Sequence, residues 1–347
     1  MNPFKRNFLQ HAHAVGGWMR THGATGGMDV ITLQMQISLG GKSLRFFPQF
    51  TANNANGDMA FFPDMLDGVN GFVGWYPYQA KAWPAAQTKL AFKQLAAQSQ
   101  LRVPPWTQDL SQVKGAFIIK ADRSSLGQGL RGPFHVPAGS AVPSTLQLAA
   151  GEYAEQFVLG RLVKAWYWNQ QLAVAELTPM PYVQGDGHST VDQLLARKLP
   201  DGQALPEPLD SLLALQSLAR HSVLASGQSA VVDYRYMSPL NPAITQDHNV
   251  RPQIQGSKLE AQLLQAGQCF WSDIPADLRS GTICSADAVM DAQGQLWFLE
   301  LNCNPLLHPA IYSTMLDSIF GVKTEPNHTV NSTANSAAQS PVKAPAP

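Results

Sequence analysis

A predicted β-hairpin near the C-terminal end of the chain constrains the fold most strongly. Two apolar runs, Ala286–Met290 and Gln295–Leu301, flank the tetrapeptide DAQG, and a turn of this kind between such runs is typical of a hairpin. Asp287 lies on the first run, and Glu300 and Asn302 lie at the end of the second. Because successive strand side chains alternate between faces, Glu300 and Asn302 point the same way, and the hairpin returns Asp287 beside them.

This hairpin end would gather two carboxylates and one carboxamide. Hard oxygen ligands of this kind are what Mg²⁺ prefers, especially when the phosphates of a substrate complete its coordination shell. The alternative for an isolated D…E-x-N pattern is a set of solvated turn residues. The choice between the two depends on whether other parts of a nucleotide site occur along the chain.

The pattern D-x12-E-x-N-x-x-P resembles the metal-binding hairpin of the ATP-grasp superfamily, as seen in D-alanine–D-alanine ligase and cyanophycin synthetase. The resemblance implies that Asp287, Glu300 and Asn302 bind Mg²⁺, or Mn²⁺ in its place, and that Pro305 closes the motif. It also implies ATP as cofactor and an α+β fold in which two subdomains grip the nucleotide.

A predicted amphipathic helix, Thr88 to Gln98, precedes the rest of the ATP-grasp pattern. Thr88 is suited to cap its N-terminus, and Pro104-Pro105 follow its end. By itself this pattern is an ordinary surface helix. It is also similar to the helix before the ATP-binding domain of the ligases, which implies a phosphate contact for Lys89 and a structural role for Lys93.

A short apolar strand, Ala116–Lys120, ends on a lysine and leads into a Gly/Ser-rich loop, Ser124 to Gly132. Glycine lets backbone N–H groups approach phosphate oxygens, and a lysine supplies a compact positive charge. The loop is no Walker A motif, and alone it is also typical of a plain turn. Its resemblance to the ATP-grasp lid over the triphosphate assigns nucleotide contacts to Lys120, Ser125, Gly127 and Gly129.

The stretch Tyr153–Val158 is a predicted strand, and a hairpin follows it over residues 162–176. The form E-x-[FY]-[VIL]-x-G of the family's adenine hinge matches Glu155, Phe157 and Val158, which implies that they contact the base. Seven residues after the hinge glutamate the family usually has an acid for the ribose, whereas this chain has Leu162. Lys164 stands where related enzymes carry a basic residue that faces the active site.

The string V-x-GDG-x-S-T-V at residues 183–191 resembles the cyanophycin synthetase and bifunctional glutathione synthetase group, and Val191–Arg197 is a predicted helix after it. The ligases often carry an arginine two residues before the metal aspartate, whereas this chain has Ser285. A guanidinium can hold phosphate oxygens bidentately. Arg235 and Arg279 are therefore alternatives for stabilising the reaction intermediate, and each is also typical of a surface charge.

Composition sets further limits. The 347 residues have a formal net charge of zero and 45% hydrophobic residues, a balance that does not favour binding to nucleic acid or membrane. The three cysteines show no CxxC spacing, which favours reduced thiols in a cytoplasmic protein.

Three segments are expected. Residues 1–85 form a divergent N-terminal domain, where Met28–Leu39 and Ser43–Phe50 read as strands and the aromatic residues at 72, 75, 76 and 78 read as core. Residues 86–321 form the ATP-grasp domain. The polar tail, residues 322–347, is expected to be disordered.

The order of these motifs predicts an ADP-forming ligase that activates a carboxylate as an acyl phosphate and joins it to an amine. Its partners would be small-molecule carboxylate and amine substrates, with an amino acid or peptide as one of them, and the resemblance leaves a homodimer open. Two alternatives remain: a small-molecule kinase with the same fold, and a non-catalytic nucleotide-binding protein.

Overall fold

The computed structural model describes residues 3–54, 59–124, 129–199, 209–235, 238, 240 and 248–322. Within these residues all paired strands run antiparallel, and the fold is a mixture of helices and several antiparallel sheets. This confirms the predicted α+β class. Of the described helices, none is both long enough and apolar enough to span a bilayer.

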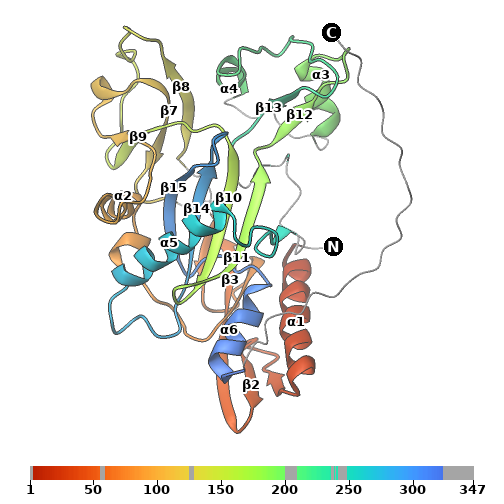
Figure 1. Cartoon of the computed structure of the whole chain (residues 1–347). Helices are drawn as coiled ribbons and strands as arrows, with labels where there is room; N and C mark the ends of the chain where they lie inside the picture. The colour runs from red at the N-terminus through yellow and green to blue at the C-terminus, as the bar shows by residue number, and fades with distance from the viewer. Residues whose placement is uncertain are drawn as a thin grey trace.

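A four-stranded sheet of order β11-β10-β14-β15 lies at the centre of the molecule (Figure 1). Its strands are β10 (Arg161–Trp168), β11 (Gln171–Pro179), β14 (Ile283–Met290) and β15 (Leu296–Cys303). The predicted hairpin is therefore confirmed as β14–β15, and its turn closes at Asp291, whose backbone N–H and carbonyl bond to Gln295 and Gly294.

The two faces of the central sheet pack into different cores because side chains alternate along each strand. Val163 and Ala165 of β10 pack with α2 (Lys89–Gln98) and α5 (Lys258–Asp273) on one face. Trp166 and Trp168 pack with α6 (Ile311–Phe320) and the N-terminal sheet on the other face. Near the start of β10, Leu162 belongs to neither of these cores. It packs in a separate apolar cluster that also contains Ile118 of the neighbouring sheet.

Two smaller sheets adjoin the central one (Figure 1). One has the order β6-β9-β7-β8, with β6 (Trp106–Thr107), β7 (Gly115–Ala121), β8 (Arg131–Val136) and β9 (Glu152–Gln156). The other pairs β12 (Tyr182–Gln184) with β13 (Ser229–Val231) beside α3 (Val191–Lys198) and α4 (Leu209–Ala214). Two short 3₁₀ helices cover Pro84–Ala86 and Leu110–Gln112.

Side chains cap the starts of α2 and α3. The Thr88 side chain accepts a bond from the Ala91 N–H at the start of α2, as predicted. Thr190 and Gln193 form a capping box at the start of α3.

The N-terminal region is an antiparallel sheet with a long helix packed on it. The sheet has the order β1-β2-β3-β4 with β5 also on β3, and the elements are α1 (Pro3–His22), β1 (Thr25–Met28), β2 (Met35–Leu39), β3 (Lys42–Asn53), β4 (Met59–Phe62) and β5 (Val69–Tyr76). Phe72, Trp75 and Tyr76 are buried and Tyr78 is partly buried, so their assignment to the core is confirmed.

Two N-terminal expectations need correction. The predicted strand Met28–Leu39 is interrupted, because the Asp29 side chain accepts bonds from the Ile31 and Thr32 N–H groups and closes a turn. The sequence analysis also missed α1. Its Gly16-Gly17 pair disfavours a helix locally, and packing of Val15 and Trp18 into the core outweighs that preference.

The N-terminal sheet is joined closely to the loop that follows β15. The Leu307 N–H donates to the Val73 carbonyl over 3.1 Å, and Leu307 joins the core of that sheet. Gly74, at φ +137°, allows this approach, because a Cβ there would lie 2.7 Å from the Leu307 side chain. The N-terminal sheet therefore shares a hydrophobic core with α6 and with the loop that follows β15.

Gly74→Ala is expected to destabilise the fold by about 2–4 kcal/mol, since it adds both a strained φ and a clash with Leu307. Gly40→Ala is the matched control, because Gly40 also has a positive φ (+58°) but a Cβ there meets nothing within 4 Å. Its cost should be about 1–2 kcal/mol. Urea unfolding of both variants measures the difference, and equal costs would contradict the close packing at Gly74.

Candidate functional site

A cavity of about 500 Å³ is lined by the central sheet, the β7–β9 strands and the N-terminal sheet. Most predicted site residues lie on its walls: Lys89, Lys120, Glu155, Phe157, Val158, Lys164, Arg235, Asp287, Glu300 and Asn302. The structure thus brings together residues that are more than 200 positions apart in the sequence.

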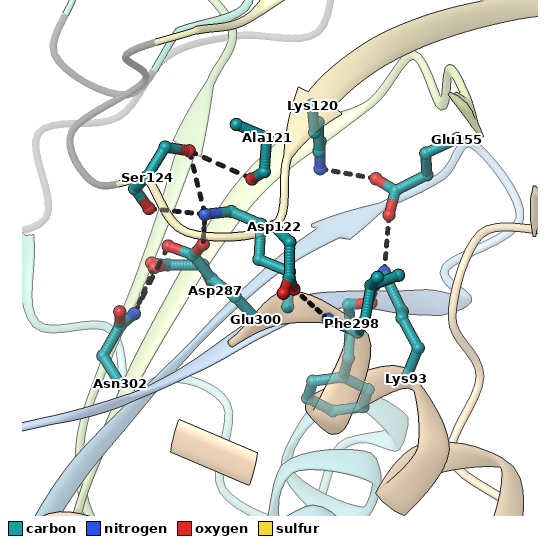
Figure 2. Close-up of polar contacts among 12 residues, drawn as sticks. Lys93, Lys120, Ala121, Asp122, Ser124, Glu155, Asp287, Phe298, Glu300 and Asn302 are labelled. Carbon is teal, nitrogen blue, oxygen red and sulfur yellow. Dashed lines mark hydrogen bonds and ion pairs between the residues drawn. The ribbon is translucent and has the colours of Figure 1, made fainter. Parts of the chain in front are cut away.

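The predicted metal ligands meet on the β14–β15 hairpin, where Asp287 and Glu300 pair in the middle of the ladder (Figure 2). Asp287 is the cross-strand partner of Glu300, and the Asn302 Nδ2 donates to Asp287 Oδ2 over 2.9 Å and to Glu300 Oε1 over 3.4 Å. A half-turn of the Asn302 amide would present its carbonyl oxygen to the same point. The predicted convergence of the three side chains is therefore observed.

Register and a β-bulge decide which side chains face the cavity. Lys164 of β10 is the direct cross-strand partner of Asp287, so both lie on one face, and their side chains form an ion pair of 2.7 Å. The β14–β15 register shifts next to Asp287, so that Leu299 and Glu300 both line the cavity.

The two carboxyl groups are electrostatically unequal. Burial raises the pKa of Asp287, and the negative charge of Glu300 raises it further against the opposing effect of Lys164. Burial also acts to raise the pKa of Glu300, but Lys89, Asp287 and Lys164 outweigh it, and its pKa is lowered. A divalent cation between the two would relieve the repulsion that raises the pKa of Asp287, so the donor set fits Mg²⁺.

The carboxamide of Asn302 is needed as a third ligand if this site is to hold Mg²⁺. Within the described ranges, no group of three His, Cys, Asp or Glu side chains could hold a metal. Two carboxylates and Asn302 supply fewer protein ligands than the six of an octahedral ion, as is usual where substrate phosphates and water complete the shell.

Lys89 reaches the same point from the first turn of α2. Its ammonium group lies 3.2 Å from Glu300 and donates to the carbonyl and hydroxyl oxygens of Ser124, over 2.5 and 3.2 Å. Asp122 holds the helix start in place by accepting the Leu90 N–H over 2.8 Å. The contact with Ser124 joins α2 to the segment that leads into the predicted lid.

Lys93, Lys120 and Glu155 form a second ionic cluster (Figure 2), which is almost completely buried. The Glu155 carboxylate contacts Lys120 over 2.5 Å and Lys93 over 2.6 Å, and Lys93 is fully buried. Burial raises the pKa of Glu155, but Lys120 and Lys93 outweigh it, and the net change is a lowering. Burial lowers the pKa of Lys93 to about 8 despite the nearby Glu155.

The cavity also has an apolar wall. It is formed by side chains from five separate segments: Ile118, Leu162, Met180, Val289 and Leu299. Phe157 and Val158 of the predicted hinge border it, and the Phe157 N–H donates to the Ala116 carbonyl. Leu162, which replaces the acid expected for ribose, is buried here opposite Val289 and extends the apolar surface.

The remaining predicted residues are placed differently. Arg235 lines the cavity and is held by Asp233, with contacts of 3.0 and 2.9 Å from its Nε and Nη2. Arg279 is absent from the lining, and its guanidinium donates to the carbonyls of Ile274 and Ser272 at the C-terminal end of α5. Gly129 is described but does not line the cavity, and the predictions for Ser125 and Gly127 concern positions outside the described residues.

The sequence analysis missed part of the apolar wall and the pairing behind it. Lys93 does not line the cavity, and its fully buried contact with Glu155 agrees with the structural role implied for it. Met180 and Leu299 complete the apolar wall, and the bulge that turns Leu299 inward leaves no pattern in the sequence.

No family model and no curated protein matches this chain. Similar solved structures include a bifunctional glutathione synthetase from Pasteurella multocida, at 14% identity over 90% of this chain and 43% of that chain, with a TM-score of 0.42. D-alanine–D-alanine ligase from Bacillus anthracis is 11% identical over 68% of this chain and 66% of that chain, with a TM-score of 0.35. The ATP-grasp ligase PsnB is 13% identical over 67% of this chain and 60% of that chain, with a TM-score of 0.32.

The solved structures to which this chain is similar are thus a synthetase and two ligases, one of them described as an ATP-grasp ligase. The chain spans less than half the length of the glutathione synthetase chain that it matches. Because these TM-scores are below 0.5 and the identities are low, the likeness carries no weight for the activity, which depends on the residues of the site itself.

Glu155→Gln is expected to destabilise the fold by about 3–5 kcal/mol, because it leaves two lysines without their shared buried carboxylate. Glu152→Gln is the matched control on the same strand. It breaks the contact with the more exposed Arg131 and should cost about 1 kcal/mol. Denaturant unfolding at pH 7 measures both, and equal costs would contradict a structural role for the buried cluster.

Glu155→Gln should also change how the free energy of unfolding depends on pH under acidic conditions. A folded-state pKa below the ordinary value of 4.5 for Glu155 gives stability that is present above pH 4.5 and lost as the pH falls through the folded-state value. The free energy of unfolding of the wild type should therefore fall below pH 4.5 more steeply than that of Glu155→Gln.

Proposed function

We propose that this chain is an ATP- and Mg²⁺-dependent, ADP-forming ligase that activates a carboxylate and joins it to an amine. The observation that supports this most is the convergence of the acid–acid–amide set with Lys89, Lys120 and Lys164 in one cavity. The same cavity has an apolar wall. A nucleotide has the same division between a charged triphosphate and a flat apolar base.

Each part of the nucleotide has residues suited to it. The apolar wall around Met180 and Leu299 suits the base, since burial of its flat faces is favourable there. Lys89 and Lys120 suit the phosphates as compact positive charges that are already oriented by Glu300 and Glu155. The carboxylate of Glu155 is engaged by two lysines, so its contribution to nucleotide binding is to hold them in place.

Asp287, Glu300 and Asn302 would hold Mg²⁺, which when bound neutralises phosphate charge and polarises the phosphorus centre. Lys164 neutralises Asp287 from the adjacent strand and fixes its orientation. Arg235, held in a forked contact by Asp233, presents the remaining guanidinium donors at the cavity wall, where they would stabilise charge that develops on the reacting oxygens.

In the proposed reaction the substrate carboxylate attacks the γ-phosphate of ATP and ADP leaves. The amine then attacks the resulting acyl phosphate, and inorganic phosphate departs as the amide forms. The chain does not have to supply a nucleophile. Its side chains bind and orient the two substrates, and the enclosing walls exclude water from the activated carboxyl group.

Product analysis tests this proposal. The chain is incubated with Mg-ATP and a panel of amino acids, singly and in pairs, and released ADP, phosphate and product masses are measured. Release that requires a carboxylate and an amine together, with a product of summed mass less water, is the expected result. A phosphorylated product formed from a single substrate would instead indicate a kinase.

Glu300→Ala is expected to lower turnover by at least 100-fold, because it removes one metal ligand and the partner of Lys89. Asp67→Asn, which changes an exposed acid outside the cavity, is the control and should leave turnover unchanged. Circular dichroism of both variants separates lost chemistry from lost folding. Unchanged turnover in Glu300→Ala would exclude the hairpin from metal binding.

A further inference from the structure

The cavity wall that comes from the N-terminal sheet carries no charge. Six lining residues precede position 84, and they are Gln49, Phe61, Phe62, Pro63, Gln79 and Ala80. All seven charged lining residues come from position 89 onward. Within the described part of the chain, the N-terminal residues therefore give the cavity a neutral wall, and the later segments give it all its charged groups.

The neutral wall is fixed next to the proposed metal ligands. Asn304, two residues after Asn302, exchanges hydrogen bonds with the backbone of Lys81, over 2.6 and 3.1 Å. The Tyr76 hydroxyl donates to the Pro305 carbonyl, and Trp166 Nε1 donates to the Leu306 carbonyl over 2.7 Å. Because this loop and the N-terminal sheet are held together, a molecule on the neutral wall would lie beside the reacting phosphate.

The cation next to this wall is already engaged elsewhere. The Lys81 ammonium group donates to the Leu278 and Ser280 carbonyls and to the Thr282 hydroxyl. A carboxylate placed on the neutral wall would thus lose its hydration without gaining a cation from it.

The segment that supplies Phe61 to the neutral wall is exposed and rich in large apolar side chains. Phe61, Met65 and Leu66 are 39%, 51% and 48% exposed, an unusual set of large apolar side chains within six residues. Asp64 and Asp67 lie exposed in the same segment, outside the cavity lining.

We propose that the neutral wall is the subsite for the non-nucleotide substrate and that it selects an uncharged, apolar or aromatic side group. This rests on the proposed function and deepens it by naming the substrate class. Phe61 would provide the main apolar contact, and Gln49, whose amide is anchored to the Gln79 carbonyl over 2.9 Å, would form the floor. The reacting carboxyl or amino group of the substrate would face Asn302 and Lys164.

Calorimetric titration tests this on the full chain saturated with Mg²⁺ and a non-hydrolysable ATP analogue. The probes are L-phenylalanine, L-leucine, L-glutamate and L-lysine. We expect the two apolar amino acids to bind at least tenfold more tightly than the two charged ones. Equal or tighter binding of L-glutamate or L-lysine would overturn the proposal, as would no binding of either apolar probe to a chain that binds the nucleotide.

Variants at exposed positions locate the subsite. Phe61→Ala should weaken L-phenylalanine binding at least tenfold and leave nucleotide affinity within twofold, whereas Met65→Ala, outside the lining, should change neither. Gln79→Lys should raise L-glutamate affinity at least tenfold by adding a cation to the wall. Unchanged affinities in both Phe61→Ala and Gln79→Lys would place the subsite elsewhere.

The same titration separates the two proposals. Absence of nucleotide binding would remove the proposed function, and the subsite proposal would fall with it. Nucleotide binding combined with a preference for charged amino acids would remove the subsite proposal alone.

Discussion

The buried carboxylate of Glu155 between Lys93 and Lys120 is the interaction on which the rest of the site depends. It joins three elements, because Lys93 belongs to α2, Lys120 to β7 and Glu155 to β9. Fixing α2 in this way also fixes its first turn, from which Lys89 reaches Glu300 on the central sheet. One desolvated ionic cluster therefore sets the distance between the lysines of one sheet and the carboxylates of another.

Such a cluster is a costly way to stabilise a fold, since the desolvation of buried charges offsets most of their attraction. Only 14% of the residues are charged, yet four lysine–carboxylate contacts gather in or behind a single cavity. This concentration is explained more readily by a polyanionic ligand than by stability. The lysines and acids already point toward one another, so a phosphate and a divalent cation would replace these contacts with little reorganisation of the protein.

Much of this arrangement could be predicted from the sequence, where a local rule determined the structure. Strand alternation placed Glu300 and Asn302 on one face, the DAQG turn returned Asp287 beside them, and Thr88 marked the start of α2. Positions set by long-range packing could not be predicted. Helix α1 forms despite its glycine pair because the core stabilises it, and the β-bulge beside Asp287 depends on how two strands meet.

The pairing of charged side chains could be predicted only in part from the sequence. The alignment of Lys164 with Asp287 depends on the register of β10 against β14, strands more than 100 residues apart, and only a resemblance to known ligases pointed to that lysine. The sharing of Glu155 between Lys93 and Lys120 had no sequence signal beyond helical spacing. The neutral wall of the cavity depends on the N-terminal sheet, which packs against the loop after Asn302. No sequence motif predicted that packing.

The most direct test of the central claim, that this cavity binds a nucleotide through a divalent cation, is an equilibrium titration of the purified chain with ATP. The titration is made once in Mg²⁺ and once in excess chelator. Saturable one-to-one binding that weakens at least tenfold without the cation is the predicted result. No binding in either buffer, or equal binding in both, would contradict the assignment of Asp287, Glu300 and Asn302 as a metal site that serves a nucleotide.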